Sequence, residues 1–277
     1  MARYQLLYER VLQMDGVELV VPEPVPVSEL LRVHEAGYVA RALDGHLDKM
    51  EQRRLGFPWS PQLVERSLRS VGATLAGAVW ACEGGGVAVN LAGGTHHAFA
   101  DRGEGFCLFN DCVVAARHWQ EHVARRGQVV FIDCDVHQGN GTAALCRGDD
   151  SLFTFSLHGL HNYPFHKEQS DCDVELPDGC QDEFYLEQLS LGLQRLPPAE
   201  LAFYLAGADP YEKDRLGRLK LTQAGLRQRD RVVLDYCRSR GTAVVVVMAG
   251  GYAEPIEDTA AIQAATVAEA LRAYSSR

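Results

Sequence analysis

Two carboxylates and an imidazole follow a buried apolar stretch in the middle of the chain. Asp133, Asp135 and His137 stand at every second position after Val-Val-Phe-Ile. In an extended segment that spacing places all three side chains on one face. Burying two neighbouring acids is unfavourable unless a cation neutralises them, so one interpretation is a metal site. The alternative is an Asp pair that caps the next helix, with His137 as an ordinary core histidine.

A third possible ligand follows a later apolar stretch, in Leu-Ala-Gly-Ala-Asp209-Pro. A single Asp at such a place is usually a turn or cap residue, but with Asp135 and His137 it completes an Asp-His-Asp set. Three protein ligands leave positions for water and substrate, as in a catalytic zinc site. Mixed nitrogen and oxygen ligands suit Zn²⁺, and Fe²⁺ or Co²⁺ is also chemically reasonable.

Polar residues follow two further apolar stretches. His96 and His97 come after a Gly-Gly pair, and adjacent imidazoles beside a metal suit proton transfer because His titrates near neutral pH. Tyr252 comes after Gly250 and Gly251, where a backbone without side chains can approach a ligand closely. Its hydroxyl is a suitable donor to a developing oxyanion. The alternative is that all three are packed or solvated loop residues.

The elements that must position these residues can be predicted from apolar patterns. Near-continuous apolar stretches, typical of a parallel sheet covered by helices, predict strands at residues 87–91, 129–135, 152–158, 201–206 and 243–249. Apolar positions with helical spacing predict helices at residues 61–83, 111–125, 182–196, 222–240 and 255–274, the fourth capped by Thr222. This alternation predicts one α/β domain over residues 1–277, with three layers (α/β/α) and a mostly parallel central sheet. Ligands of such sheets bind beyond the carboxyl ends of the strands, where the polar residues lie.

The composition is that of an acidic protein. The 277 residues include 27 Lys and Arg against 37 Asp and Glu, a formal net charge of −10. Such a surface repels phosphate backbones, so we expect no direct nucleic-acid binding. The eight cysteines contain no CxxC pair and no apolar run is long enough to cross a bilayer, so we expect reduced thiols and no membrane association. These features predict a cytoplasmic protein, and none of them indicates an oligomeric state.

Six short motifs occur in order along residues 22–252: Gly-Gly-Thr-His-His, Gly-Phe-Cys-Leu-Phe-Asn-Asp, Ile-Asp-Cys-Asp-Val-His-Gln-Gly-Asn-Gly, Ser-Leu-His, Gly-Ala-Asp and Ala-Gly-Gly-Tyr. Several independent motifs are far more specific than any one of them. Together they resemble the histone deacetylase superfamily, which has an arginase-like α/β fold, and the loops are most similar to class IV and related bacterial members. The resemblance implies a zinc-dependent amidohydrolase that removes an acyl group, acetyl or longer, from a lysine side chain or a related amine.

The resemblance also implies a role for each matching residue. It implies one catalytic zinc ion bound by Asp135, His137 and Asp209, and a structural potassium ion bound by Asp133, Ser156 and Leu157. His97 is the implied general base, supported by Asn140 where many relatives have Asp, and His96 is its partner, supported by Asp133. Tyr252 is implied to polarise the acyl carbonyl. The implied substrate-binding residues are Gly105, Phe106, Tyr163, Leu216, Gly250 and Gly251.

Departures from the family pattern concern the substrate and the pocket rim. Residues 56–58 contain no acid where deacetylases often have one that grips the substrate backbone. The family usually begins with a strand and a loop before the segment that matches residues 2–6, so we expect one edge strand and one rim loop to be absent. The expected partner is an acylated lysine-containing protein or a small acylated amine.

Three alternatives remain open from the sequence. An acylpolyamine amidohydrolase would suit the net charge of −10, but polyamine-selective relatives place an acid near the position of Leu216. A ureohydrolase of the same fold needs the ligands of a second metal, which the sequence does not show. A non-catalytic acyl-lysine binding protein is expected to lack Tyr252 or a zinc ligand, and all of these are present.

Overall fold

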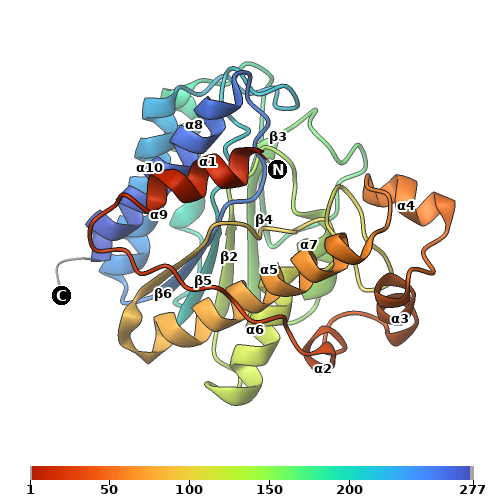
Figure 1. Ribbon diagram of the computed structural model, residues 1–277. Coiled ribbons are helices and arrows are strands. Elements are labelled where there is room, and N and C mark those ends of the chain that lie inside the picture. The colour runs from red at the N-terminus through yellow and green to blue at the C-terminus, as the bar shows by residue number, and fades with distance from the viewer. Residues whose placement is uncertain (1, 275–277) are drawn as a thin grey trace.

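The computed structural model, which describes residues 2–274, has a central sheet of six parallel strands in the order β1-β6-β5-β2-β3-β4 (Figure 1). The strands are β1 (Val87–Asn90), β2 (Val129–Asp133), β3 (Leu152–Gly159), β4 (Cys172–Leu176), β5 (Leu201–Leu205) and β6 (Ala243–Val247). Five of them lie where the apolar stretches predict strands. The predicted α/β fold with a parallel central sheet is therefore confirmed, and β4 is an additional strand at the sheet edge.

Helices cover both faces of this sheet (Figure 1). One face carries α5 (Pro61–Trp80) and α6 (Asp111–His122), and the other carries α8 (Asp182–Leu193), α9 (Gln223–Ser239) and α10 (Ile256–Tyr274), with α1 (Ala2–Val11) packed against α10. The remaining helices are α2 (Val27–Leu30), α3 (Ala36–Asp44), α4 (Lys49–Leu55), the π-helical turn η1 (Ala81–Gly85) and α7 (Asn140–Cys146).

Alternate side chains of the central strands enter two separate apolar layers. On β2, Val130 and Ile132 face the layer beneath α8, α9 and α10, whereas Val129 and Phe131 face the layer beneath α5 and α6. In the second layer Phe131 stacks on Phe203 of β5 with ring centroids 5.5 Å apart. Because the strands are buried on both faces, polar side chains are concentrated where the strands end.

Local signals in the sequence set the ends of the long helices. Thr222 precedes α9 and its hydroxyl accepts a hydrogen bond from Gly225 N, as predicted. Ser60 caps α5 in the same way, and Pro61 occupies the first turn, where its missing N–H is not needed. No helix in the described residues is both long and apolar enough to cross a membrane, and the eight cysteines are free thiols.

Candidate metal centre and active site

The three predicted metal ligands meet at the carboxyl ends of two adjacent strands. Strands β2 and β5 are paired in the sheet although about 70 residues separate them in the chain, so Asp135 and His137 after β2 meet Asp209 after β5. His137 Nδ1 lies 2.9 Å from Asp135 Oδ1 and 3.3 Å from Asp209 Oδ2. One donor atom from each residue lies within 4.8 Å of the other two, close enough for a single ion.

The local backbone differs from the extended segment that the sequence predicts. Strand β2 ends at Asp133, and the following residues turn, with each Asp side chain accepting a hydrogen bond from the backbone N–H two residues later. Asp133 Oδ2 lies 2.6 Å from His96 Nδ1, and Asp135 Oδ1 lies 3.9 Å from His96 Nε2 and 2.9 Å from His137 Nδ1. The alternation of faces nevertheless continues past the strand end, because Cys134 and Val136 lie in the same apolar layer as Val130 and Ile132. Short Asx-type turns, which the apolar pattern does not reveal, decide which partner each of the three polar side chains contacts.

The chemistry of this group fits a bound cation. Asp209 is fully buried, and its Oδ2 has no hydrogen-bond donor among the described residues. Burial and the adjacent Asp135 carboxylate raise the pKa of Asp209 to about 7, which reflects the difficulty of holding both acids charged without a cation. Gly250 leaves room for both carboxylates, since a Cβ at that position would overlap Asp209 Oδ2. Two carboxylates and one imidazole are a ligand set that suits zinc.

A second group of possible ligands, Glu29, His118 and His122, lies between α2 and α6. Here the Glu29 carboxylate already accepts hydrogen bonds from Arg32 Nε at 2.8 Å and from His118 Nδ1 at 3.0 Å. The Arg32 guanidinium also lies 3.4 Å from His122 Nε2. A cationic side chain therefore occupies the position an ion would take, unlike the group at Asp209.

The adjacent histidines beside the metal centre have different partners. His97 Nδ1 lies 2.6 Å from Asn140 Oδ1, and His96 Nδ1 lies 2.6 Å from Asp133 Oδ2. Burial and the nearby His96 and His137 hold the pKa of His97 well below its usual value. Burial also lowers the pKa of His96, but the Asp133 and Asp135 carboxylates outweigh that effect and raise it to about 9. These opposite shifts favour a proton on His96 and a neutral His97.

Aromatic residues surround this pair. The Tyr163 ring makes an edge contact with His97 at a centroid distance of 5.0 Å, and Phe106 lies 6.2 Å from Tyr252. Burial raises the pKa of the Tyr252 hydroxyl, which therefore stays protonated and able to donate. Gly105 packs against the His97 ring, where a Cβ would lie 2.6 Å from the imidazole.

Three residues that the sequence did not single out support the aromatic groups. Glu104 accepts a hydrogen bond from the Tyr163 hydroxyl and one from Asn140 Nδ2 at 3.3 Å. Asp214 accepts from Tyr252 N at 2.6 Å, and Arg3 donates to Gly251 O at 2.8 Å with its guanidinium 5.2 Å from the centre of the Tyr252 ring. Only their neighbours in the fold reveal these roles, because charged residues in loops and terminal helices carry no local signal.

The remaining predicted site residues lie in two places. Leu216 is 45% exposed in the loop after β5, and its N–H donates to Asp214 Oδ1 at 2.8 Å. For the predicted potassium site, Asp133 and Ser156 are paired in register on β2 and β3, and Leu157 follows. Ser156 Oγ lies 2.9 Å from His158 Nδ1. The structure thus brings the side chains of Asp133 and Ser156 onto neighbouring strands.

A parallel α/β sheet that carries an Asp-His-Asp group, two hydrogen-bonded histidines and a tyrosine at its carboxyl edge has the side chains to hold a metal ion and to move protons. A family model described as "Histone deacetylase domain" matches residues 1–269. The chain belongs to the histone deacetylase family.

Individual relatives agree with this assignment. An uncharacterized protein of Picosynechococcus is 43% identical over 93% of this chain and 87% of its own length. Histone deacetylase 2 of Arabidopsis thaliana is 34% identical over 66% of this chain, and the match spans about half (49%) of the plant protein.

Solved structures share the fold at low sequence identity. A crystal structure of an HDAC homologue complexed with SAHA has a TM-score of 0.79 at 21% identity and covers 99% of this chain and 82% of that one. An acetylpolyamine aminohydrolase from Burkholderia pseudomallei has a TM-score of 0.77 at 19% identity, covering 97% and 90%.

Proposed function

We propose that this chain is a zinc-dependent hydrolase that removes an acyl group, acetyl or longer, from a lysine side chain or a related amine. The observation that carries the proposal is the buried Asp135–His137–Asp209 group beside the His96–His97 pair. Family membership supports amide hydrolysis, and the chemistry of the ligands supports zinc. The potassium ion implied at Asp133, Ser156 and Leu157, and action in the cytoplasm, belong to the same proposal, the latter supported by the eight free cysteines.

The histidines set the direction of proton movement. When bound, the metal would polarise the acyl carbonyl and acidify a water molecule. His97 Nδ1 faces the Asn140 amide oxygen, so Nε2 is the nitrogen that takes the proton from the attacking water. Water oxygen then bonds to the carbonyl carbon, while the Tyr252 hydroxyl donates a hydrogen bond to the developing oxyanion. A protonated histidine finally returns a proton to the amine nitrogen as the C–N bond breaks.

The aromatic residues exclude water and orient the substrate. Tyr163 lies against the ring of His97 and Phe106 lies near the ring of Tyr252, at centroid distances of 5.0 and 6.2 Å. A narrow apolar passage favours a linear acyl-amine arm over bulky or branched amides. Glu104 fixes the Tyr163 ring through its hydroxyl, so the wall has a defined position before substrate enters.

The experiment that tests this function is a substrate panel assayed with zinc-loaded protein. It contains acetyl-lysine and longer acyl-lysine peptides together with acetylated polyamines, and elemental analysis reports the metal content. We expect hydrolysis of at least one acyl-lysine substrate, with loss of activity on exhaustive chelation and recovery with zinc. Activity that survives chelation would contradict the metal assignment, and no hydrolysis of any acyl amine would contradict the proposed reaction.

A further inference from the structure

Helix α4 ends against the wall of the proposed acyl tunnel. Phe106 N donates to Leu55 O at 2.8 Å, and Gly105 N donates to Arg54 O at 3.2 Å. The rings of Phe57 and Phe106 lie 4.9 Å apart, and a Cβ on Gly56 would lie 2.6 Å from the Phe106 ring. This close packing makes the last turn of α4 and the residues after it part of the tunnel mouth.

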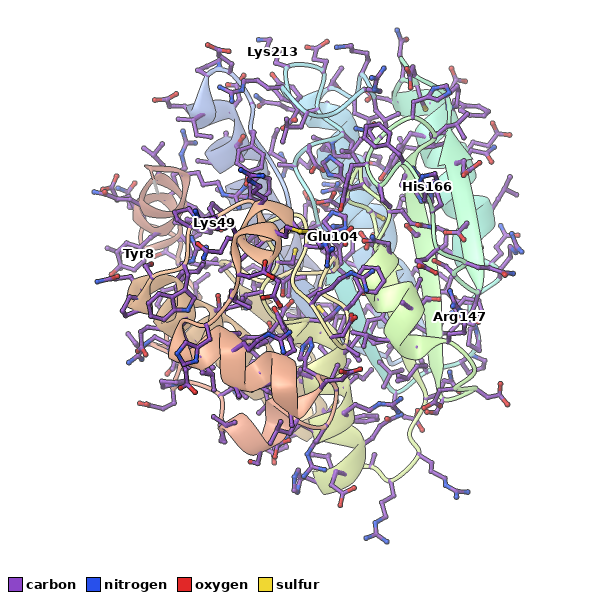
Figure 2. All side chains as sticks on the ribbon, turned by 90° about the vertical axis from the view of Figure 1, so that its right-hand side faces the viewer. Tyr8, Lys49, Glu104, Arg147, His166 and Lys213 are labelled. Atoms are coloured by element: carbon purple, nitrogen blue, oxygen red, sulfur yellow. The ribbon has the colours of Figure 1, made fainter. Side chains whose placement is uncertain are left out.

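One face of α4 borders a surface depression that includes Phe57, the neighbour of Phe106. Lys49, Gln52, Arg53 and Gly56 recur at intervals of three and four residues and therefore share that face. Together with Phe57 and Pro58 they line an open surface depression of about 410 Å³. Figure 2 shows Lys49 on α4, on the side of the molecule that faces the viewer.

The side chains of Lys49 and Arg53, the two cationic residues of this depression, are available to a ligand. Gln52 is occupied, since its Nε2 donates to Leu47 O and its Oε1 accepts from Trp59 N. Lys49 and Arg53 are exposed and form no ion pair with any residue between positions 2 and 274. Lys49 is the first residue of α4, where the helix dipole disfavours a cation, so the helix gains no stability from this charge.

The acids nearby are engaged elsewhere. Asp48 accepts from the N–H groups of Met50 and Glu51 in a capping box, and Glu51 pairs with Arg41 at 2.8 Å on another side of the helix. Glu104 accepts hydrogen bonds from Tyr163 and Asn140, and Asp214 accepts them from three backbone N–H groups. Among the described residues none of these carboxylates pairs with Lys49 or Arg53, so both cations remain available to a ligand although the whole chain carries a net charge of −10.

We propose that Lys49 and Arg53 form a subsite for a carboxylate of the substrate, above an apolar floor made by Phe57. The proposal rests on the proposed deacylase function and names its substrate class: acylated amines that carry a carboxylate near the scissile amide. The Arg53 guanidinium can bind a carboxylate through two parallel hydrogen bonds, and the Lys49 ammonium adds a second charge. The carboxylate can come from an acidic residue beside an acylated lysine or from a small acylated amino acid.

The experiment uses matched substrates that differ only in the charge near the scissile amide. The peptide arm compares acyl-lysine peptides of one length whose flanking residues are Glu, Gln or Lys. The small-molecule arm compares acyl-lysine that has a free α-carboxylate with its α-carboxamide. Each is assayed with wild type, with Lys49→Ala/Arg53→Ala and with Arg125→Ala/Arg126→Ala. The last variant removes the same charge from exposed residues next to the amino end of β2, far from the tunnel along the strand.

We expect wild type to prefer the acidic substrate over the neutral one by about fivefold in kcat/KM, mainly through KM, because two exposed ion pairs are gained. The preference should fall as salt is added and should vanish in Lys49→Ala/Arg53→Ala but not in Arg125→Ala/Arg126→Ala. The arm with the larger effect identifies the source of the carboxylate. Hydrolysis without a charge preference, or a preference that the first variant retains, would overturn the subsite and leave the deacylase function standing. If no substrate is hydrolysed, fluorescence anisotropy with the same peptides decides the subsite, and equal binding of Glu and Lys peptides refutes it.

Discussion

His96 and His97 are adjacent in the chain, but one hydrogen-bond partner of each ring gives the two a different electrostatic environment. His96 faces the Asp133 carboxylate, whereas His97 faces only the amide dipole of Asn140. A carboxylate stabilises an imidazolium much more than an amide does, so His96 holds its proton and His97 is ready to accept one. This difference supports His97 as the general base and His96 as its partner. From the sequence, these two roles were implied only by the family resemblance.

His97→Ala should nearly abolish hydrolysis, while His96→Ala should leave a measurable remainder. The first variant removes the group that takes the proton from water, and the second removes a charged neighbour of that group. Single-turnover rates with one acyl-lysine peptide, at matched metal content, measure the difference. If His96→Ala is the more severe variant, the roles of the two residues are exchanged.

Tyr252→Phe should lower kcat strongly and leave metal content and folding unchanged. Only the hydroxyl is removed, and loss of one oxyanion donor typically raises the barrier by ~3 kcal/mol, a factor of roughly 100 or more. Arg3 and Asp214 hold the backbone of this loop and do not depend on the hydroxyl. A rate within twofold of wild type would show that another group stabilises the oxyanion.

At the scale of elements, the loops after the strands are as constrained as the strands themselves. The loop after β6 places Gly250 N 2.8 Å from Asp135 Oδ2, and Ala208 N donates to Gly250 O at 3.0 Å. The ligand loops of β2, β5 and β6 are therefore locked to one another. Apolar patterns predict five of the strands, but these contacts between loops have no local sequence signature.

Gly250→Ala should weaken metal binding and reduce activity, because the added methyl would overlap the Asp209 carboxylate and force the loop outward. Gly37→Ala in α3 is the matched control, since the methyl meets nothing nearer than 3.6 Å and Ala favours a helix by roughly 0.5–1 kcal/mol. Zinc titration and elemental analysis measure the outcome. Equal metal affinity in Gly250→Ala and wild type would show that the loop can relax at no cost.

Glu269 is one of the buried acids that join α9 and α10, and its effect on stability depends on pH. Glu269 is fully buried and accepts hydrogen bonds from Arg227, Arg231 and Arg272. Burial raises the pKa of Glu269, but these three arginines outweigh that and lower it to about 2. Because the folded pKa lies below the ordinary value of about 4.3, the contribution is full above that pH and is lost as pH falls toward 2.

Glu269→Gln should therefore lower the free energy of unfolding at pH 7 by about 2 kcal/mol, an amount reduced from the full pKa effect because the arginines are partly exposed. The difference in the free energy of unfolding between variant and wild type should decrease steadily as the pH falls from about 4.3 to about 2. Urea unfolding at a series of pH values measures it, with exposed Glu257→Gln on the same helix as control. A gap that is constant with pH would show that Glu269 acts through packing alone.

For the whole molecule, the order of the strands decides which residues meet. The sequence predicts the α/β class and five strands, but it does not show that β2 lies beside β5, because that pairing is non-local. The edge strand β4 escaped prediction because only its two end residues, Cys172 and Leu176, are buried. The first 60 residues also form four helices that were not predicted, among them α4, which borders the tunnel mouth.

Substrate choice depends on all the residues at the tunnel mouth. Leu216 is the one that bears on polyamine substrates, because polyamine-selective relatives place an acid near its position. Its side chain is 45% exposed, its N–H is held by Asp214, and its carbonyl accepts from Asn162 Nδ2 at 2.9 Å. The loop is therefore fixed, and a new side chain here points where Leu216 now does. Asp214, two residues before it, is buried and accepts hydrogen bonds from three backbone N–H groups, so direct contact with a substrate ammonium is limited.

Wild type should hydrolyse acyl-lysine peptides better than acetylspermidine, and Leu216→Glu should shift the ratio of kcat/KM toward the polyamine. A carboxylate beside an ammonium contributes roughly 1–3 kcal/mol through a charge-assisted hydrogen bond, which predicts a shift of about tenfold at this exposed position. The diffuse net charge of −10 acts in the same direction in both proteins and is screened within about 8 Å, so it does not produce the difference. Leu216→Gln keeps the size of the glutamate without its charge and should leave the ratio near that of wild type. A wild type that already prefers acetylspermidine by tenfold, or an equal shift in the Gln variant, would show that another part of the mouth recognises the amine.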